Sequence, residues 1–513
     1  MGAISETGLV LIFIPVLEAL VSDISSSSNP NLEASRPKSR GYAMYVFWIM
    51  FLISFLNYMD RNVLAGAAAT VAKELGFGND GIGYLATAFI FVYAITTIPL
   101  GIWADRAKRK NVIAICVAIW SVATALTALA TNFTTLFLSR MVLGIGEAGY
   151  FPAGTALMSD YFSRRRRSRI MSWWSVGQLV GILVGFVIGG ELAGLFTGSW
   201  RLAFVFTGIP GLILAFLAWK LREPRRNEAD EEELALYPFT VGEVAEIEEP
   251  PHTIAVSAAA RSEENVGRGI AAQLKVIFSQ LGALLRIKTL VVLIVMQIFA
   301  FFVLGVNVTF LPTYLQQKDI FGLSPGTAGI FSGGVIVLAG LLGTVSGGYL
   351  ADWLNRRYQG ARVLACGIGF LLSAPAFAYA VTSRSFIVFS ALFVLTTILV
   401  TIYTGPSTAA TQDVVPSALR ASSIAISLLI AHLLGDALSP SIVGLLAAHF
   451  DPHPVLDSKL FLTGRYLSQA LLITCTPALV IAGLVGIFGA RWMKTDVASA
   501  EEADRLARET ATA

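Results

Sequence analysis

Charged residues are scarce in this chain, and their scarcity excludes an ordinary water-soluble domain. Of its 513 residues only 14% are Asp, Glu, Lys or Arg, while 55% are hydrophobic. Soluble domains carry about 25% charged residues. The apolar residues form unbroken runs of about 20 rather than alternating patterns, which indicates membrane helices and not a membrane barrel. We therefore expect an all-α integral membrane protein.

Catalytic and nucleotide-binding motifs are also missing. The sequence has no Gly-x-x-x-x-Gly-Lys-Ser/Thr phosphate loop, no His-Glu-x-x-His and no Gly-x-Ser-x-Gly. Its three cysteines all lie in apolar runs, where they favour packing over a disulfide framework or a metal site. We therefore expect neither an enzyme nor an ATP-driven pump, and no cofactor or metal.

Twelve apolar runs are long enough to cross a bilayer at about 1.5 Å per residue. Six precede a polar stretch of the chain and six follow it, which predicts twelve transmembrane helices in two six-helix bundles. The runs cover about 42–72, 81–104, 111–131, 133–158, 169–195, 200–221, 285–316, 324–351, 361–382, 385–411, 421–447 and 465–491.

The remaining segments are tails and a linker. The N-terminal tail, 1–41, has a short apolar patch followed by a Ser-rich stretch that we expect to be disordered. The patch is too short for a span and lacks the basic flank of a signal peptide. We place the bundles at 42–221 and 285–492, joined by an acidic, partly disordered linker, 222–284. A charged tail, 493–513, completes the chain.

Basic residues gather in loops on one side of the predicted spans. Examples are 106–110, 164–169 and 356–362, whereas the opposite loops are short and poor in Lys and Arg. Such loops face the cytoplasm. We therefore place both termini and the linker in the cytoplasm, with the protein in the plasma (inner) membrane.

The ends of spans two and eight repeat each other. Three pairs of residues are each 247 positions apart: Gly101 and Gly348, Asp105 and Asp352, Arg109 and Arg356. A repeat with the same orientation predicts two bundles related by an axis along the membrane normal, which can rock about a site on that axis.

Ionisable residues lie deep within the first and fourth spans. Asp60 and Arg61 interrupt an apolar run, where each charge costs roughly 2.5–3.5 kcal/mol on insertion scales. Neighbours on a helix point about 100° apart, so these two cannot neutralise each other well. Arg140 and Glu147 share one face of span four. We expect the four to form one cross-helix cluster with no net charge.

Span eleven carries a second polar pair, His432 and Asp436. They are four residues apart and therefore share a helix face. Chains of acidic residues and histidines form proton relays in transporters. This pair is therefore a predicted proton-coupling site.

The repeated loop resembles the signature of the major facilitator superfamily, G-x-x-x-D-R-x-x-R-[KR]. Asp105, Arg106 and Arg109 match it in the first copy, and Asp352 and Arg356 match it in the second, where Trp353 replaces the first Arg. The resemblance implies a cytoplasmic gate whose charge contacts hold that side shut in one state.

Other motifs resemble the Spinster-like branch of this superfamily. They are Asn57-Tyr58-Met59-Asp60-Arg61, Arg140-x-x-x-Gly-x-Gly-Glu147 and His432-Leu-Leu-Gly-Asp436. The resemblance implies a monomeric, proton-coupled transporter of an amphipathic anionic lipid, of the lysophospholipid or sphingoid-phosphate type. By this resemblance, Asp60 and Glu147 would be protonation sites, Arg61 and Arg140 would bind or neutralise the anionic headgroup, and His432 and Asp436 would line the C-terminal side of the cavity. We also expect Asn57 and Tyr58, in the same motif, to contact the substrate.

Two alternatives remain open from the sequence. The first is a proton- or cation-coupled symporter of a small organic anion such as a sugar acid, because the motifs of spans one and four also occur in anion:cation symporters. The second is a membrane sensor that acts through the acidic loop Arg222–Leu281, in which no signalling domain is visible.

Overall fold

The computed structural model describes residues 40–226, 228–230, 281–282, 284–358, 360–451 and 464–512. The chain forms two compact units, Met1–Val46 and Phe47–Ala513. Of the first unit, the structure describes only the beginning of the first membrane helix. Everything below concerns the second unit. The N-terminal apolar patch and the acidic residues from 231 to 280 lie outside the described residues, so the predicted domain boundaries there stay predictions.

In the described residues, the first half of the chain, called the N half below, contains seven helices. Several begin or end at the Gly and Ser residues that punctuate the apolar runs. Their bounds are α2 (Arg40–Leu75), α3 (Asn79–Arg106), α4 (Arg109–Thr127), α5 (Phe133–Ala148), α6 (Tyr150–Tyr161), α7 (Arg164–Ala193) and α8 (Trp200–Lys220).

The second half, called the C half, is more finely divided. Three of its six spans consist of more than one helical segment. The segments are α13 (Lys288–Gln316); α14 (Pro325–Gly334), η1 (Val335–Ala339) and α15 (Gly340–Asn355); α16 (Ala361–Thr382); α17 (Phe386–Thr401) and α18 (Thr404–Val414); η2 (Ser417–Leu419), α19 (Arg420–Ala431), η3 (His432–Asp436) and α20 (Ser439–Phe450); and α21 (Gly464–Gly489), followed by η4 (Ala490–Trp492) and α22 (Met493–Thr512).

The predicted twelve-span architecture is confirmed. Eleven helices in the described residues are long and apolar enough to cross a membrane. The twelfth span is the pair α5–α6, which is interrupted at Gly149. A side chain at Gly149 would collide with Cys116 of α4 and Leu100 of α3, so the interruption coincides with close helix packing. No β-strand occurs in the described ranges.

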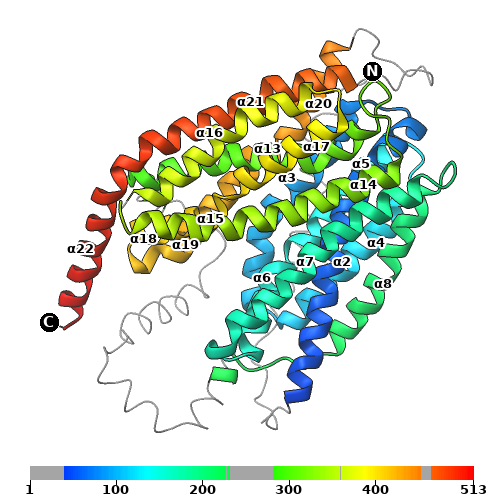
Figure 1. Ribbon diagram of the computed structural model, residues 1–513. Helices are drawn as coiled ribbons and strands as arrows, with labels where there is room; N and C mark the ends of the chain where they lie inside the picture. Colours follow the sequence, from blue (N-terminus) through cyan, green and yellow to red (C-terminus); the bar gives the residue numbers. More distant parts are fainter. Residues whose placement is uncertain are drawn as a thin grey trace. The chain divides into compact units, whose positions relative to one another are not determined.

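Each half has its own packed interior. In the N half α4 packs against both α8 and α5, with Trp120 and Trp200 fully buried. In the C half α16 lies beside α21 along most of its length, and α13 also packs on α21 (Figure 1). Large aromatic side chains, such as Phe310 and Phe370, fill this second interior.

Among the described residues, the most extensive contacts between the two halves are those of α3 with α20 and of α7 with α14. Both contacts lie at the end of the spans where α3 and α14 begin, called the closed end below. Glycines allow close approach there: a side chain at Gly83 would collide with Pro440, and one at Gly190 with Pro325. Ser441 Oγ donates a hydrogen bond to Thr87 Oγ1 at 2.7 Å. The opposite end, where Arg109 and Arg362 lie, is called the basic end.

The helix α22 is fastened to the basic end of the C half. Asp496 Oδ2 accepts a hydrogen bond from the Thr289 backbone N–H at 2.7 Å, and Asp504 Oδ1 accepts one from the Ser417 backbone N–H at 3.0 Å. Both donors lie in the first turn of a helical segment, where amide groups lack partners within the helix. The carboxylates of α22 therefore cap two membrane spans.

Candidate functional site

A cavity of about 290 Å³ lies between the halves. Helices α2, α3, α5 and α7 line it from the N half, and α13 and η3 line it from the C half. Most of its wall is apolar, with Leu85, Phe89 and Phe301 among the larger side chains. The polar and charged lining residues are Tyr58, Arg61, Asn62, Arg140, Thr309 and Asp436. The cavity thus combines a largely apolar wall with two guanidinium groups and one carboxylate.

Arg61 forms an ion pair with Glu147 across the α2–α5 interface. Arg61 Nε donates to Glu147 Oε2 at 2.5 Å. The Glu147 side chain is fully buried, while 21% of the Arg61 side chain remains exposed. The guanidinium also lies over the rings of Tyr93 and Tyr58, 4.5 and 5.0 Å from their centres. Arg61 is therefore held by an acid behind it and aromatic rings beside it, and it faces the cavity.

Arg140 lines the same cavity without a carboxylate partner. Among the described residues no Asp or Glu oxygen lies within 4.0 Å of its guanidinium, and its buried Nε has no hydrogen-bond acceptor. Its guanidinium lies 5.3 Å from the ring centre of Phe204 on α8. An aromatic face attracts a cation but does not cancel its charge. Arg140 thus presents a buried positive charge to the cavity.

Asp60 lies behind the cavity wall. It is 1% exposed and is absent from the residues that line the cavity. Thr124 Oγ1 of α4 donates to Asp60 Oδ2 at 3.3 Å, while Oδ1 has no partner in the described part of the chain. The expected cluster of four is therefore brought within electrostatic range, but only Arg61 and Glu147 are in direct contact. Asp60 and Arg140 contact Thr124 and Phe204 instead.

The other residues of the span-one motif are divided between cavity and interior. Tyr58 lines the cavity beside Arg61. Asn57 is 2% exposed and does not line it, and its side-chain Nδ2 has no acceptor among the described residues. The structure thus places Tyr58 where a substrate can touch it, and Asn57 within the helix packing.

His432 and Asp436 approach the cavity from the C half. His432 Nδ1 lies 3.0 Å from Asp436 Oδ2, and the His432 ring meets Phe301 edge-on with centres 4.7 Å apart. Asp436 is a lining residue, so a carboxylate of the C half and the guanidinium of Arg61 share one cavity. The pair lies in η3, a single turn of π-helix. The predicted proton-coupling pair therefore exists as a contact.

Ion pairs of the basic end involve residues that the repeat did not identify. Arg109 pairs with Asp160 at the end of α6. In the C half Arg362 pairs with Asp413 at the end of α18, and also with Asp352 at 3.0 Å. The side chain of Asp105 lies outside the described part, and Arg106 ends α3.

A second internal offset explains these pairs. Arg109 and Arg362 are 253 positions apart, as are Asp160 and Asp413. The helix-end motif repeats at 247 positions and therefore relates Arg109 to Arg356 instead. Arg356 is exposed and forms no ion pair among the described residues. A search of the sequence for charged pairs 253 positions apart would have identified Arg362, Asp160 and Asp413.

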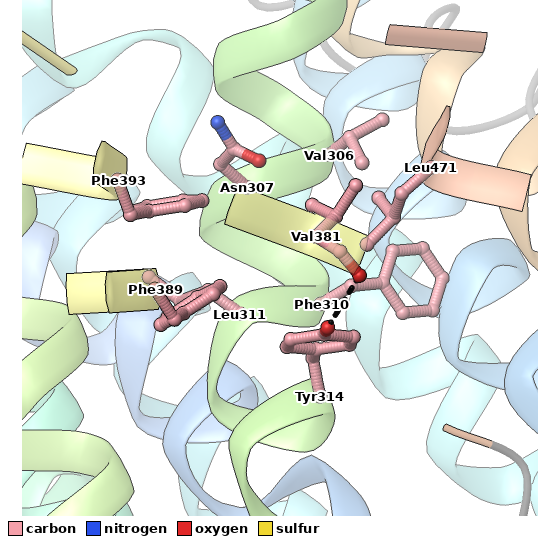
Figure 2. A pocket seen from close by; sticks show the side chains of 9 residues that line it. All are labelled: Val306, Asn307, Phe310, Leu311, Tyr314, Val381, Phe389, Phe393 and Leu471. Atoms are coloured by element: carbon pink, nitrogen blue, oxygen red, sulfur yellow. Dashed lines mark hydrogen bonds between the residues drawn. The ribbon is translucent and has the colours of Figure 1, made fainter. Parts of the chain in front are cut away.

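A smaller apolar pocket lies wholly within the C half (Figure 2). Its volume is about 10 Å³, which is too small for an organic ligand. Tyr314 Oη donates to the Val381 carbonyl at 3.0 Å on one side, and Asn307 supplies the only amide side chain among the residues drawn. This pocket is a packing gap between α13, α16, α17 and α21. It leaves the larger cavity as the candidate site.

The fold and the cavity between paired bundles define a membrane transporter. The family model of the Major Facilitator Superfamily matches residues 50–440. The chain belongs to this superfamily.

Within the superfamily the expected Spinster-like resemblance is confirmed. Protein spinster of Drosophila melanogaster is 28% identical over 82% of this chain, and the match spans 65% of that protein's length. A crystal structure described as a bacterial homolog to the human lysosomal transporter Spinster, inward-facing and unoccupied, has a TM-score of 0.73. It is 24% identical and covers 90% of this chain and 99% of its own. The "probable galactarate/D-glucarate transporter" of Escherichia coli K12 is 27% identical over 66% of this chain and 73% of its own.

Proposed function

We propose that this protein is a proton-coupled secondary transporter that moves an amphipathic anion across the membrane by alternating access. The observation that carries the proposal is Arg140, a buried guanidinium that lines an otherwise largely apolar cavity without a carboxylate partner. Asp60 and Glu147 act on this guanidinium electrostatically but do not contact it, and a buried charge without a contacting partner is costly. A substrate anion that enters the cavity would supply the missing partner, while its apolar part would cover Leu85, Phe89 and Phe301.

Coupling to protons would act through the Arg61–Glu147 pair. When Glu147 takes up a proton, its ionic attraction for Arg61 is lost, and Arg61 becomes available to a substrate anion in the cavity. When the substrate leaves, Arg61 returns to Glu147 and favours release of the proton. We assign this role to Glu147 rather than to Asp60 because Glu147 contacts a guanidinium that reaches the cavity, whereas Asp60 is bound to Thr124 behind the wall. His432 and Asp436 would serve as the relay of the C half.

The substrate class we favour is a lysophospholipid or a sphingoid phosphate. Such molecules have one anionic headgroup and a long apolar tail. The relatives named spinster and the apolar wall of the cavity support this choice. In keeping with the basic loops, we place the basic end in the cytoplasm of a plasma (inner) membrane protein that works as a monomer.

A small organic anion such as a sugar acid is the second candidate. The similarity to a probable galactarate/D-glucarate transporter favours it. A sugar acid carries several hydroxyl groups that need hydrogen-bond partners, and the cavity offers Tyr58, Asn62 and Thr309 as uncharged polar side chains. The number of partners is small for such a ligand, so this candidate ranks second.

Transport by the purified protein in proteoliposomes separates the two candidates. We expect a fluorescent lysophosphatidate to cross in response to an imposed pH gradient, and galactarate to neither cross nor compete. Arg140→Gln should abolish this flux. Arg465→Gln, which removes an exposed Arg outside the cavity, should leave it unchanged. Galactarate flux without lysophosphatidate flux would reverse the ranking.

The sensor alternative can be tested in the same vesicles. Deleting residues 231–249 removes most of the acidic run and preserves Glu228, which pairs with Arg222 at 3.0 Å. A transporter should keep its flux after this deletion. Loss of flux in a folded protein would show that the acidic loop takes part in the function.

A further inference from the structure

Two membrane spans of the C half each contain one turn of π-helix among the described helices. The turns are η1 (Val335–Ala339) in span eight and η3 (His432–Asp436) in span eleven. In η3 the Ala437 N–H donates to the His432 carbonyl at 2.9 Å, five residues back instead of four. Single π turns are rare and often lie at functional sites. The facing helices of the N half, α3 and α7, carry no such turn.

Span eight changes its packing partner at its π turn. Before η1, α14 packs on α7 of the N half, and Gly329 leaves no room for a side chain against Phe186. After η1, α15 packs within the C half, and Gly343 leaves no room against Ile398 and Thr401. The α14 segment also packs on α13 of its own half. The turn therefore separates a segment that contacts both halves from a segment that packs within the C half.

Span eleven shows the same change in reverse order along the chain. The helix before η3, α19, packs on α13 and α18 of its own half. The helix after it, α20, packs on α3 of the N half, where Gly444 lies against Asn79, and also on α21 and α13 of its own half. The two spans that join the halves at the closed end thus each contain an irregular turn at the edge of the cross-half contact, where η3 still touches α3 and η1 still touches α7.

We propose that η1 and η3 are the hinges of the C half. The inference rests on the alternating access proposed above. The basic end closes when α15 and α19 bend at these turns, while α14 and α20 stay docked on α7 and α3. This order of events gives an occluded state in which neither end is open. A π turn suits a hinge because it contains one residue more than the α-helix needs, and its loss or gain bends the helix without breaking it.

The hinge of span eleven also belongs to the substrate site. Asp436 is its last residue and lines the cavity, and His432 is its first. A change between π and α geometry therefore moves the carboxylate relative to Arg61. In this way η3 is a positioning element that ties closure of the basic end to the cavity. The residues of η1 are all apolar and do not line the cavity, so this turn acts only as a hinge.

Deleting one residue from each turn tests the proposal, because it removes the extra residue and restores the α-helical pattern. Leu338 and Leu434 are suitable, since they are 61% and 52% exposed and contribute little to the interior. The controls Leu338→Ala and Leu434→Ala keep the residue count. Spin labels on Lys108→Cys and Gln412→Cys, exposed positions of opposite halves at the basic end, report opening. The three native cysteines are buried and should not react.

We expect the parent protein and both alanine controls to show two label distances, whose populations change when lysophosphatidate is added or the buffer is acidified. Each deletion variant should show one distance that no longer responds. If the deletion variants keep both label distances, the hinge proposal is wrong, while alternating access still stands. A parent protein with one distance in every condition would contradict alternating access, and the hinges with it.

Hydrogen exchange on the unmodified protein provides a second test that does not depend on the variants folding. Amides of residues 335–339 and 432–436 should exchange faster than those of α14 and α20. Their exchange should also change on adding lysophosphatidate. Protection equal to that of the flanking helices would contradict the proposal.

Discussion

Arg61 and Glu147 form an ion pair in which only one partner reaches the cavity. The distance from Arg61 Nε to Glu147 Oε2 is 2.5 Å. The Glu147 side chain is fully buried, whereas 21% of the Arg61 side chain is exposed. Any change at the acid must therefore act on a substrate through the arginine. We therefore expect a substitution of Glu147 to affect transport by changing the availability of Arg61.

Glu147→Gln should separate exchange from proton coupling. The amide remains uncharged at every pH and can still accept a hydrogen bond from Arg61. We expect exchange of labelled for unlabelled lysophosphatidate to continue, while accumulation driven by a pH gradient is lost. Both are measured in the same proteoliposomes. Full accumulation by the variant would show that Glu147 does not carry the coupled proton, and Asp60→Asn would then be the next variant to examine.

Phe204 should contribute to substrate affinity through Arg140. Cation–π contacts are worth about 0.5–2 kcal/mol. Because each 1.4 kcal/mol is a factor of ten, Phe204→Leu should weaken lysophosphatidate binding by about 2- to 30-fold. The matched control is Phe216→Leu, also on α8, where the contact is with Lys220 at 5.5 Å and the ring is exposed. Equal effects of the two substitutions would contradict a role for Phe204 at the site.

The ion pairs of the basic end should differ in their contribution to stability. Asp160 and Arg109 have 6% and 13% exposed side chains, whereas Asp352 is 68% exposed. Removing one partner of a buried pair costs about 3–5 kcal/mol, and an exposed pair contributes about 0–1 kcal/mol. Arg109→Gln should therefore lower the Tm in detergent far more than Asp352→Asn.

The same melting experiment distinguishes Arg362 from Arg356. Arg362→Gln removes contacts to two carboxylates, while Arg356→Gln removes no ion pair of the described residues. We expect a measurable decrease in Tm for the first substitution and none for the second. A larger effect of Arg356→Gln would contradict the correspondence based on the 253-residue offset.

The closed end should be sensitive to single methyl groups. A β-carbon at Gly329 would collide with the Phe186 carbonyl oxygen, whereas one at Gly334 would meet no heavy atom within 4 Å. Gly329→Ala should therefore favour the state in which the closed end is open, and Gly334→Ala should not. The label distance between Lys108→Cys and Gln412→Cys reports this change as a shorter basic-end separation. An unchanged distance in Gly329→Ala would show that the α7–α14 contact does not control access.

The sequence predicted the spans well because a run of apolar residues has few alternatives to a membrane helix. It did not predict the interruption at Gly149 or the two π turns. Those features depend on the residues that pack against the helix. Gly149 packs against Cys116 and Leu100, and Gly435 of η3 packs against Ile298 and Phe301. Apolar periodicity is the same on both sides of such a turn, so it carries no signal of the change.

The candidate site was predicted in its residue types but not in its pairing. Position along a span gives depth in the membrane, and depth placed Asp60, Arg61, Arg140 and Glu147 near one another. Pairing depends on the direction in which each side chain leaves its helix. Thr124 and Phe204, which bind Asp60 and Arg140, come from spans with no charged residue at that depth. Hydroxyl and aromatic partners are common in membrane helices and were not recognised.

The acidic residues of α22 have a practical consequence for work on this protein. Because Asp496 and Asp504 cap α13 and the start of span eleven, helix α22 supports the same span that contains η3. A purification tag or fluorescent protein joined at Thr495 would remove both caps and disturb the relay side of the cavity from the far end of α19. Joining it after Thr512 keeps the caps, and is the safer position for any reporter of transport.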